Sequence, residues 1–320
     1  MKKFLSVIFA ILILTTSFAM ADTLTIGILQ FAPHPSLDNC RIGFIEGLKA
    51  QGFEEGKNIE IIYQNSEADM ALTNQMAQQL ADKCDLICAI ATPAAQAAFN
   101  AAMDKNVPVI YSAVSDPISA GLAKEDGTND NNITGTSDVL PVEAQLALIR
   151  EVLPEASKIG ILYSTSETNS ESTLKTYKEL APNYGFEILE EGIGVGADIP
   201  LALGSLLPKV DCTSNLTDNT VVTALPLVLE LSKEAGKPVF GSEIEQVKNG
   251  CIGAAGIEYV ELGKQTGEMA ARVLNGEFAG SIPFEAIKNS FLYINSIALE
   301  EYGIEISQDL LDKSLDVAVK

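Results

Sequence analysis

The sequence predicts an α/β protein with two Rossmann-like lobes, each built on a parallel sheet, joined by a three-strand hinge. Residues 86–91 and 107–114 are continuous apolar runs that flank an alanine-rich segment. This pattern is typical of strand, helix and strand in a parallel sheet buried on both faces. A second copy of the pattern follows later in the chain, and 320 residues suffice for two domains of ordinary size.

The second copy is visible as short motifs repeated in the same order. The first copy has the motif Lys83-x-Asp85, followed after six more residues by Thr92-Pro93. The second copy lies 126 residues later, with Lys209-x-Asp211 followed after six more residues by Asp218-Asn219. Three further pairs follow the same order: 26–29 with 159–162, 52–53 with 185–186, and 107–109 with 237–239. We therefore expect two lobes of like topology whose strand ends face one cleft, where ligands bind in such folds.

The first 21 residues are typical of a secretory signal peptide. Lys2-Lys3 precede an apolar core from Val7 to Leu14 and the small residues Ala19-Met20-Ala21. The apolar core is too short to span a bilayer. No cysteine follows the expected cleavage site, so we expect a free periplasmic protein without a lipid anchor.

The composition excludes several classes of partner. Removing Lys2 and Lys3 takes the formal charge from −22 to −24, which argues against nucleic acid and anionic membranes. One histidine makes a poor zinc site, and we expect neither metal nor cofactor. The five cysteines lie mostly at strand positions and are interpreted as buried thiols, with disulfides or metal binding as the alternatives.

In the first lobe, three strand ends are candidates for the cleft. The strand 24–29 leads into a loop with Gln30, Phe31 and His34, followed by a helix over 41–51. His34 either makes a structural hydrogen bond or lines a ligand site. Thr92 is expected to cap the helix after strand 86–91, where helix-start amides could also hold an anion. Asp116 follows strand 107–114, and a crossover strand is expected at 133–138.

In the second lobe, helix 141–153 precedes strand 159–163 and the polar segment that contains Ser164, Thr165, Ser166 and Asn169. This segment is predicted either to cradle a carboxylate or to cap the helix that reaches Leu180. Strand 210–215 leads to Asp218 and Asn219 and a helix over 221–235. Asp218 either caps this helix or pairs with a ligand ammonium.

The remaining elements complete the two lobes. A strand over 239–241 ends near Glu243, another candidate for the cleft. Strand 251–256 returns toward the first lobe, helix 262–274 follows, and strand 291–294 crosses back before short helices near Ala298 and Leu310. The predicted bounds are 22–136 with 257–288 for lobe I, and 137–256 with 289–320 for lobe II.

Several of these motifs together resemble the substrate-binding proteins of tryptophan/tyrosine-type ABC transporters. The resemblance rests on 26–38, 89–96, 114–117, 133–138, 159–170, 217–220 and 261–269. It implies the type I periplasmic-binding-protein fold and capture of a small molecule, typically an aromatic amino acid, by lobe closure. It also implies delivery to a cognate permease, by a protein that we expect to be a monomer. Carried over by position, it implicates the Gln30 to His34 loop, Thr92, Asp116, the Ser164 to Asn169 segment, Asp218-Asn219 and Glu243.

The leading hypothesis is a binding protein without catalysis. Thr92 and the Ser164 to Ser166 segment would hold a carboxylate, Asp218 an ammonium, and Phe31 with His34 the ligand side chain. The rival hypotheses are a secreted enzyme that uses Asp116, Asp218 or Glu243 as acid or base, and a binder that reports to a membrane receptor. No G-x-S-x-G elbow, phosphate loop or metal-binding spacing supports the enzyme.

Overall fold

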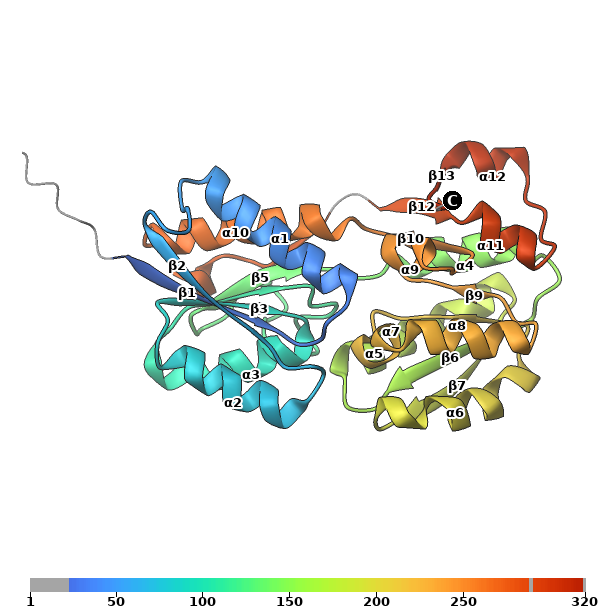
Figure 1. Ribbon diagram of the computed structural model, residues 1–320, viewed down its shortest axis with the longest axis horizontal. Coiled ribbons are helices and arrows are strands. Elements are labelled where there is room, and N and C mark those ends of the chain that lie inside the picture. The colour runs from blue at the N-terminus through green and yellow to red at the C-terminus, as the bar shows by residue number, and fades with distance from the viewer. Residues whose placement is uncertain (1–22, 288–289, 319–320) are drawn as a thin grey trace, which may run out of the picture.

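The computed structural model describes residues 23–287 and 290–318, and Figure 1 shows two lobes side by side. Lobe I contains a six-stranded sheet in which every strand is parallel to its neighbours. In spatial order the strands are β11 (Glu285–Ala286), β5 (Ile133–Ser137), β4 (Val109–Ser112), β3 (Leu86–Ile90), β1 (Leu24–Gln30) and β2 (Ile59–Asn65). Because β3 is buried along its whole length, its continuous apolar sequence is explained.

Four main helices cover this sheet, two on each face (Figure 1). They are α1 (Pro35–Ala50) with α10 (Tyr259–Leu274), and α2 (Met70–Ala81) with α3 (Thr92–Ala102). The first pair packs with the two backbones in close approach. A Cβ atom at Gly263 would lie 2.2 Å from the Cys40 carbonyl oxygen, and one at Gly43 would lie 2.0 Å from the Val260 carbonyl oxygen. Glycine is therefore required at this crossing.

Lobe II is built on a four-stranded parallel sheet and a small adjoining sheet. The larger sheet has the order β7 (Glu187–Ile193), β6 (Lys158–Ser164), β8 (Cys212–Ser214) and β9 (Val239–Phe240). The smaller one has the order β10 (Gly253–Gly256), β12 (Phe291–Ile294) and β13 (Ser314–Asp316). The helices are α4 (Val142–Val152), α5 (Thr168–Leu180), α6 (Ile199–Leu206), α7 (Asn219–Thr223), α8 (Leu225–Glu234), α9 (Ile244–Lys248), α11 (Ser296–Glu301) and α12 (Gln308–Lys313).

The repeated motifs occupy matching places in the two lobes. In lobe I the Asp85 carboxylate accepts a hydrogen bond from the Thr25 amide at 2.7 Å, and the Asp85 amide donates to the Thr25 carbonyl oxygen at 2.8 Å. In lobe II Asp211 and Lys158 exchange the same two hydrogen bonds, each at 2.8–2.9 Å. The predicted fold class, two α/β lobes with parallel sheets, is confirmed.

The chain passes between the lobes at three places, after β5, between β10 and α10, and between β11 and β12. Tyr259 at the start of α10 donates a hydrogen bond to Asp138 after β5 at 2.8 Å, so two of these crossings are tied together. Asp138 is buried, and this burial raises the pKa of its carboxyl group. The residue bounds given above for the lobes remain a prediction.

Several local expectations differ from the structure. Helix α1 begins at Pro35 rather than near residue 41, because Pro35 at the first turn needs no amide partner. The helix expected over 221–235 is two helices that break at Ala224, since Pro226 cannot donate to a preceding turn. The sequence did not indicate β11, β13 or α9.

Other expectations concern the cysteines and the leader. All five cysteines are buried and free, as predicted. The predicted signal peptide lies outside the described residues. Among the residues that are described, no helix has both the length and the apolar character needed to cross a bilayer.

Candidate functional site

The site is formed by loops at the carboxyl ends of neighbouring strands in both lobes. Strands β1 and β3 are adjacent in lobe I, and β6 and β8 are adjacent in lobe II. The loops that follow them meet across the lobes, where His34 Nε2 lies 3.2 Å from Asn219 Oδ1. Ser115 Oγ also lies 2.9 Å from Thr217 Oγ1, and the Asn39 amide donates to Glu245 at 3.2 Å. The two lobes are therefore in direct contact at the predicted edges of their sheets.

Gln30 and Phe31 shape the first loop of lobe I. The Gln30 side-chain amide donates to the Ala32 carbonyl oxygen at 2.8 Å and to Asp38 at 3.1 Å, and its oxygen accepts from the Tyr63 hydroxyl at 3.3 Å. Phe31 is buried and belongs to the core of lobe I. Both residues thus have structural partners within their own lobe, and their ligand contacts remain predictions.

His34 joins the two lobes. It precedes α1 as the N-cap residue and is buried. The structural hydrogen bond anticipated from the sequence is present, and its partner Asn219 belongs to the opposite lobe. Burial lowers the pKa of His34 to about 4, so the ring is neutral at neutral pH. Its Nδ1 atom is buried without a hydrogen-bond partner among the described residues.

Thr92 is placed differently from the expectation. Ala91 is the N-cap of α3, with φ 83° and ψ 155°, and Thr92 is the first helical residue. The predicted role of Thr92 as the cap is therefore wrong. This backbone conformation is almost confined to glycine, and such strain is concentrated at functional sites. The Thr92 hydroxyl is buried and has no partner among the residues described.

Asp218 is fully buried at the start of α7. Its carboxylate accepts hydrogen bonds from the Ser164 amide at 2.5 Å, the Ser170 hydroxyl at 2.7 Å and the Val221 amide at 2.8 Å. The last of these bonds confirms the predicted capping role. Burial, and next the nearby Glu167 carboxylate, raise the pKa of Asp218 to about 7.

Glu167 is a candidate site residue that the sequence analysis did not single out, although it lies within the Ser164 to Asn169 segment. It is 2% exposed, and five donors converge on its carboxylate. Asn219 supplies its backbone amide at 3.0 Å and its side-chain amide at 2.6 Å, and Asn169 supplies its side-chain amide at 3.3 Å. The other two donors are the amide and hydroxyl of Thr220. An acidic residue in the polar segment before the helix that reaches Leu180 was the available signal, because carboxylates favour helix starts.

The polar segment after β6 is only partly directed toward the cleft. Thr165 and Ser166 are exposed, whereas Asn169 is buried. The Ser164 amide is engaged by Asp218, and the Thr165 amide donates to the Ile193 carbonyl oxygen at 3.0 Å. These two amides are therefore not free for an anion. Asn169 donates to the Thr217 carbonyl oxygen at 2.8 Å, and its Oδ1 atom is buried without a partner in the described part of the chain.

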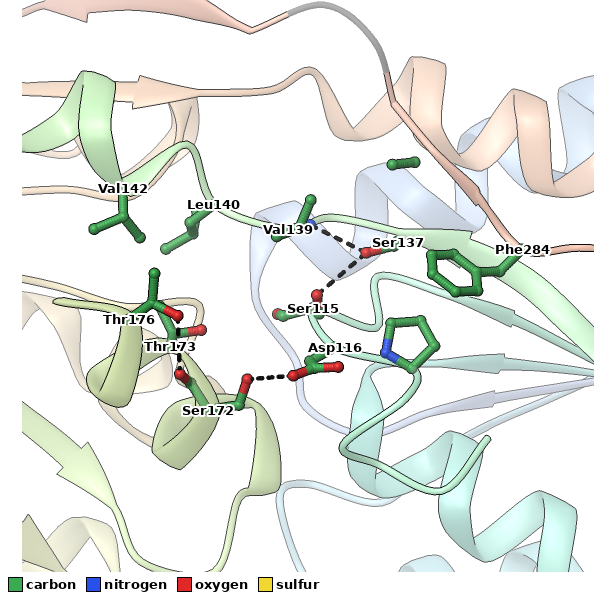
Figure 2. A pocket seen from close by; sticks show the side chains of 12 residues that line it. Ser115, Asp116, Ser137, Val139, Leu140, Val142, Ser172, Thr173, Thr176 and Phe284 are labelled. Carbon is green, nitrogen blue, oxygen red and sulfur yellow. Dashed lines mark hydrogen bonds between the residues drawn. The ribbon is translucent and has the colours of Figure 1, made fainter. Parts of the chain in front are cut away.

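Asp116 lines a cavity of about 230 Å³ between the lobes, shown in Figure 2. The Ser172 hydroxyl of α5 donates to its carboxylate at 2.7 Å, which forms another contact across the lobes. Burial alone would raise the pKa of Asp116, but hydrogen bonds from Ser119 and Ser172 outweigh this effect and lower it. Asp116 is thus a charged residue that holds the lobes together on this side.

Glu243 lies by a second cavity, of about 220 Å³, whose lining also includes His34 and Leu225. The carboxylate caps α9 by accepting from the Glu245 and Gln246 amides, and burial raises its pKa to about 7. Neither cavity is lined by Thr92 or Asp218. In residues 23–287 and 290–318, no group of three His, Cys, Asp or Glu side chains is arranged to hold a metal.

Comparison with known proteins places the chain among binding proteins. The family described as ABC transporter substrate binding protein matches residues 25–318. A tyrosine-binding protein from Clostridioides difficile is 39% identical over 281 residues, 88% of this chain and 81% of that protein.

Two solved structures are similar over nearly the whole chain. An ABC domain in complex with L-Trp from Streptococcus pneumonia is 32% identical, with a TM-score of 0.89 over 92% of this chain and 99% of that one. The ligand-free, open structure of a substrate-binding protein with adhesive properties from Clostridium difficile is 38% identical. Its TM-score is 0.69 over 93% of this chain and 100% of that one.

Proposed function

The chain belongs to the family of ABC transporter substrate-binding proteins, and from this premise we propose that it binds an amino acid with an aromatic side chain between its lobes for import. Two relatives support this ligand class: one is named a tyrosine-binding protein, and the other was solved in complex with L-Trp. The family is one of solute-binding proteins rather than enzymes.

The observation that carries the proposal is a pair of buried acids without a basic partner. Asp218 and Glu167 are 0% and 2% exposed. In the part of the chain that the structure describes, neither carboxylate forms an ion pair with lysine or arginine. Burial is the largest cause of the raised pKa of Asp218, and the Glu167 carboxylate is the next largest. Buried negative charge is costly without compensation, so a ligand ammonium is favoured here.

The opposite end of an amino acid suits lobe I. The Thr92 hydroxyl is buried without a partner at the first turn of α3, and the amides of a first helical turn have no intrahelical acceptor. A carboxylate would accept hydrogen bonds from these groups and is favoured by the helix dipole. A zwitterion oriented in this way contacts both lobes at once, and it therefore stabilises the closed arrangement.

The comparison of lobe arrangements is consistent with this role. The chain matches the L-Trp complex with a higher TM-score than the ligand-free, open structure, although the sequence identities are similar. The contacts His34–Asn219, Ser115–Thr217 and Asp116–Ser172 are those that hinge opening would break. We propose a hinge motion between the predicted lobes, export by a signal peptide cleaved after Ala21, and delivery of the ligand as a periplasmic monomer to a cognate permease.

The absence of tryptophan from the sequence allows a direct test. Emission of added L-tryptophan is followed during titration with the protein, without background from the chain. A blue shift that L-tyrosine or L-phenylalanine reverses is the expected result, with affinities from calorimetry. Calorimetric silence with all natural amino acids would refute the proposal.

A further inference from the structure

Glu167 determines which way two asparagine side chains face. Its carboxylate receives the Nδ2 atoms of both Asn219 and Asn169, at 2.6 Å and 3.3 Å. If either side-chain amide were reversed, its oxygen would face the Glu167 carboxylate. A reversed Asn169 would also turn its oxygen toward the Thr217 carbonyl oxygen, which is 2.8 Å from Nδ2. An ionised carboxylate only accepts hydrogen bonds. The amide oxygens of both residues must therefore point away from Glu167.

The orientation of Asn219 in turn fixes the proton on His34. The Asn219 Oδ1 atom, 3.2 Å from His34 Nε2, is an acceptor only, so Nε2 must carry the hydrogen. A neutral ring has one N–H, and Nδ1 is consequently a bare acceptor. This Nδ1 atom and Asn169 Oδ1 are both buried and have no partner in the described residues. Glu167 thus leaves two buried acceptors unpaired close to the contact between the lobes.

We propose that Glu167, acting through Asn219, is a specificity-determining residue that makes His34 accept a hydrogen bond from a donor on the ring of the ligand. The phenol of tyrosine and the indole N–H of tryptophan supply such a donor, and phenylalanine does not. This inference rests on the function proposed above and assigns its preference among aromatic amino acids. A bound ring without a donor leaves a buried acceptor unpaired, so phenylalanine binds about tenfold more weakly, or worse.

The first experiment measures the ratio of the dissociation constants of L-phenylalanine and L-tyrosine by calorimetry. We expect a ratio of about ten or more in the wild type and a ratio within about threefold in Glu167→Gln and His34→Leu. Glu171→Gln is the matched control, because Glu171 is an exposed residue of the same helix start, and it should keep the wild-type ratio. A wild-type ratio near one, or an unchanged ratio in Glu167→Gln, would overturn the inference.

The second experiment needs no ligand. His34 is the sole histidine of the sequence, so in a protein without a histidine tag the imidazole nitrogen signals belong to one residue. Nitrogen NMR should place the proton on Nε2 in the wild type and increase the Nδ1–H tautomer in Glu167→Gln. A proton on Nδ1 in the wild type contradicts the network. Failure to bind any amino acid would instead refute the proposed function, so the two failures are distinguishable.

Discussion

Replacement of Asp218 by asparagine isolates the proposed contact with the ligand ammonium. Among the residues described, the carboxylate has three donors, and its Oδ1 oxygen accepts only from the Val221 amide. Asparagine keeps the shape but removes the charge and one acceptor oxygen. Loss of one partner from a buried charge pair costs about 2–5 kcal/mol. The expected decrease in affinity for L-tyrosine or L-tryptophan is therefore about 30-fold to several thousandfold.

The control for this variant is Asp211→Asn. Asp211 accepts the Ser157 and Lys158 amides at 2.7 Å and 2.8 Å, but it lies at the opposite end of the same sheet. Calorimetry should show an affinity within about twofold of the wild type for Asp211→Asn. Thermal unfolding of both variants identifies any general loss of structure. An unchanged affinity in Asp218→Asn, or equal losses in the two variants, would refute the role of Asp218.

Three further predictions concern pH, packing and thiol access. Burial raises the pKa of Asp218 to about 7, and an ammonium requires the ionised acid. The affinity measured by calorimetry should therefore be highest above about pH 7 and decrease by up to about tenfold per pH unit below it. A flat profile down to about pH 5.5 would contradict this. Gly263→Ala should lower the free energy of unfolding by about 1–3 kcal/mol, because the added methyl group meets the Cys40 carbonyl oxygen. Gly204→Ala is the control in α6, because a Cβ atom there has nothing within 4 Å and should not destabilise the helix. Urea titrations compare the two variants. All five thiols are buried, so a thiol reagent should react only after unfolding, and rapid labelling of the native protein would contradict the packing.

The architecture could be predicted from the sequence because the patterns that indicate it are local and occur twice. Continuous apolar runs marked buried strands, and matching motifs such as Lys83-x-Asp85 and Lys209-x-Asp211 marked equivalent turns. The rule that sites lie at the carboxyl ends of parallel strands then located the loops that contain His34 and Asp218. These loops do meet across the lobes.

The details of the site depended on contacts between distant residues. Glu167 becomes important only because Asn219 and Thr220, more than 50 positions away, direct their amides at it. The N-cap is Ala91 rather than Thr92 because Ala91 has a positive φ, a backbone conformation that an alanine in the sequence does not predict. Neither feature leaves a pattern in the local sequence.

The contacts between the lobes bear on how the proposed hinge opening would proceed. His34–Asn219, Ser115–Thr217, Asp116–Ser172 and Asn39–Glu245 all join polar side chains. In the proposed opening, water would replace each of these bonds, so breaking one costs only about 0.5–3 kcal/mol, with the higher values where a carboxylate accepts. Polar contacts of this kind would let the proposed carrier open and close repeatedly without disrupting the core of either lobe.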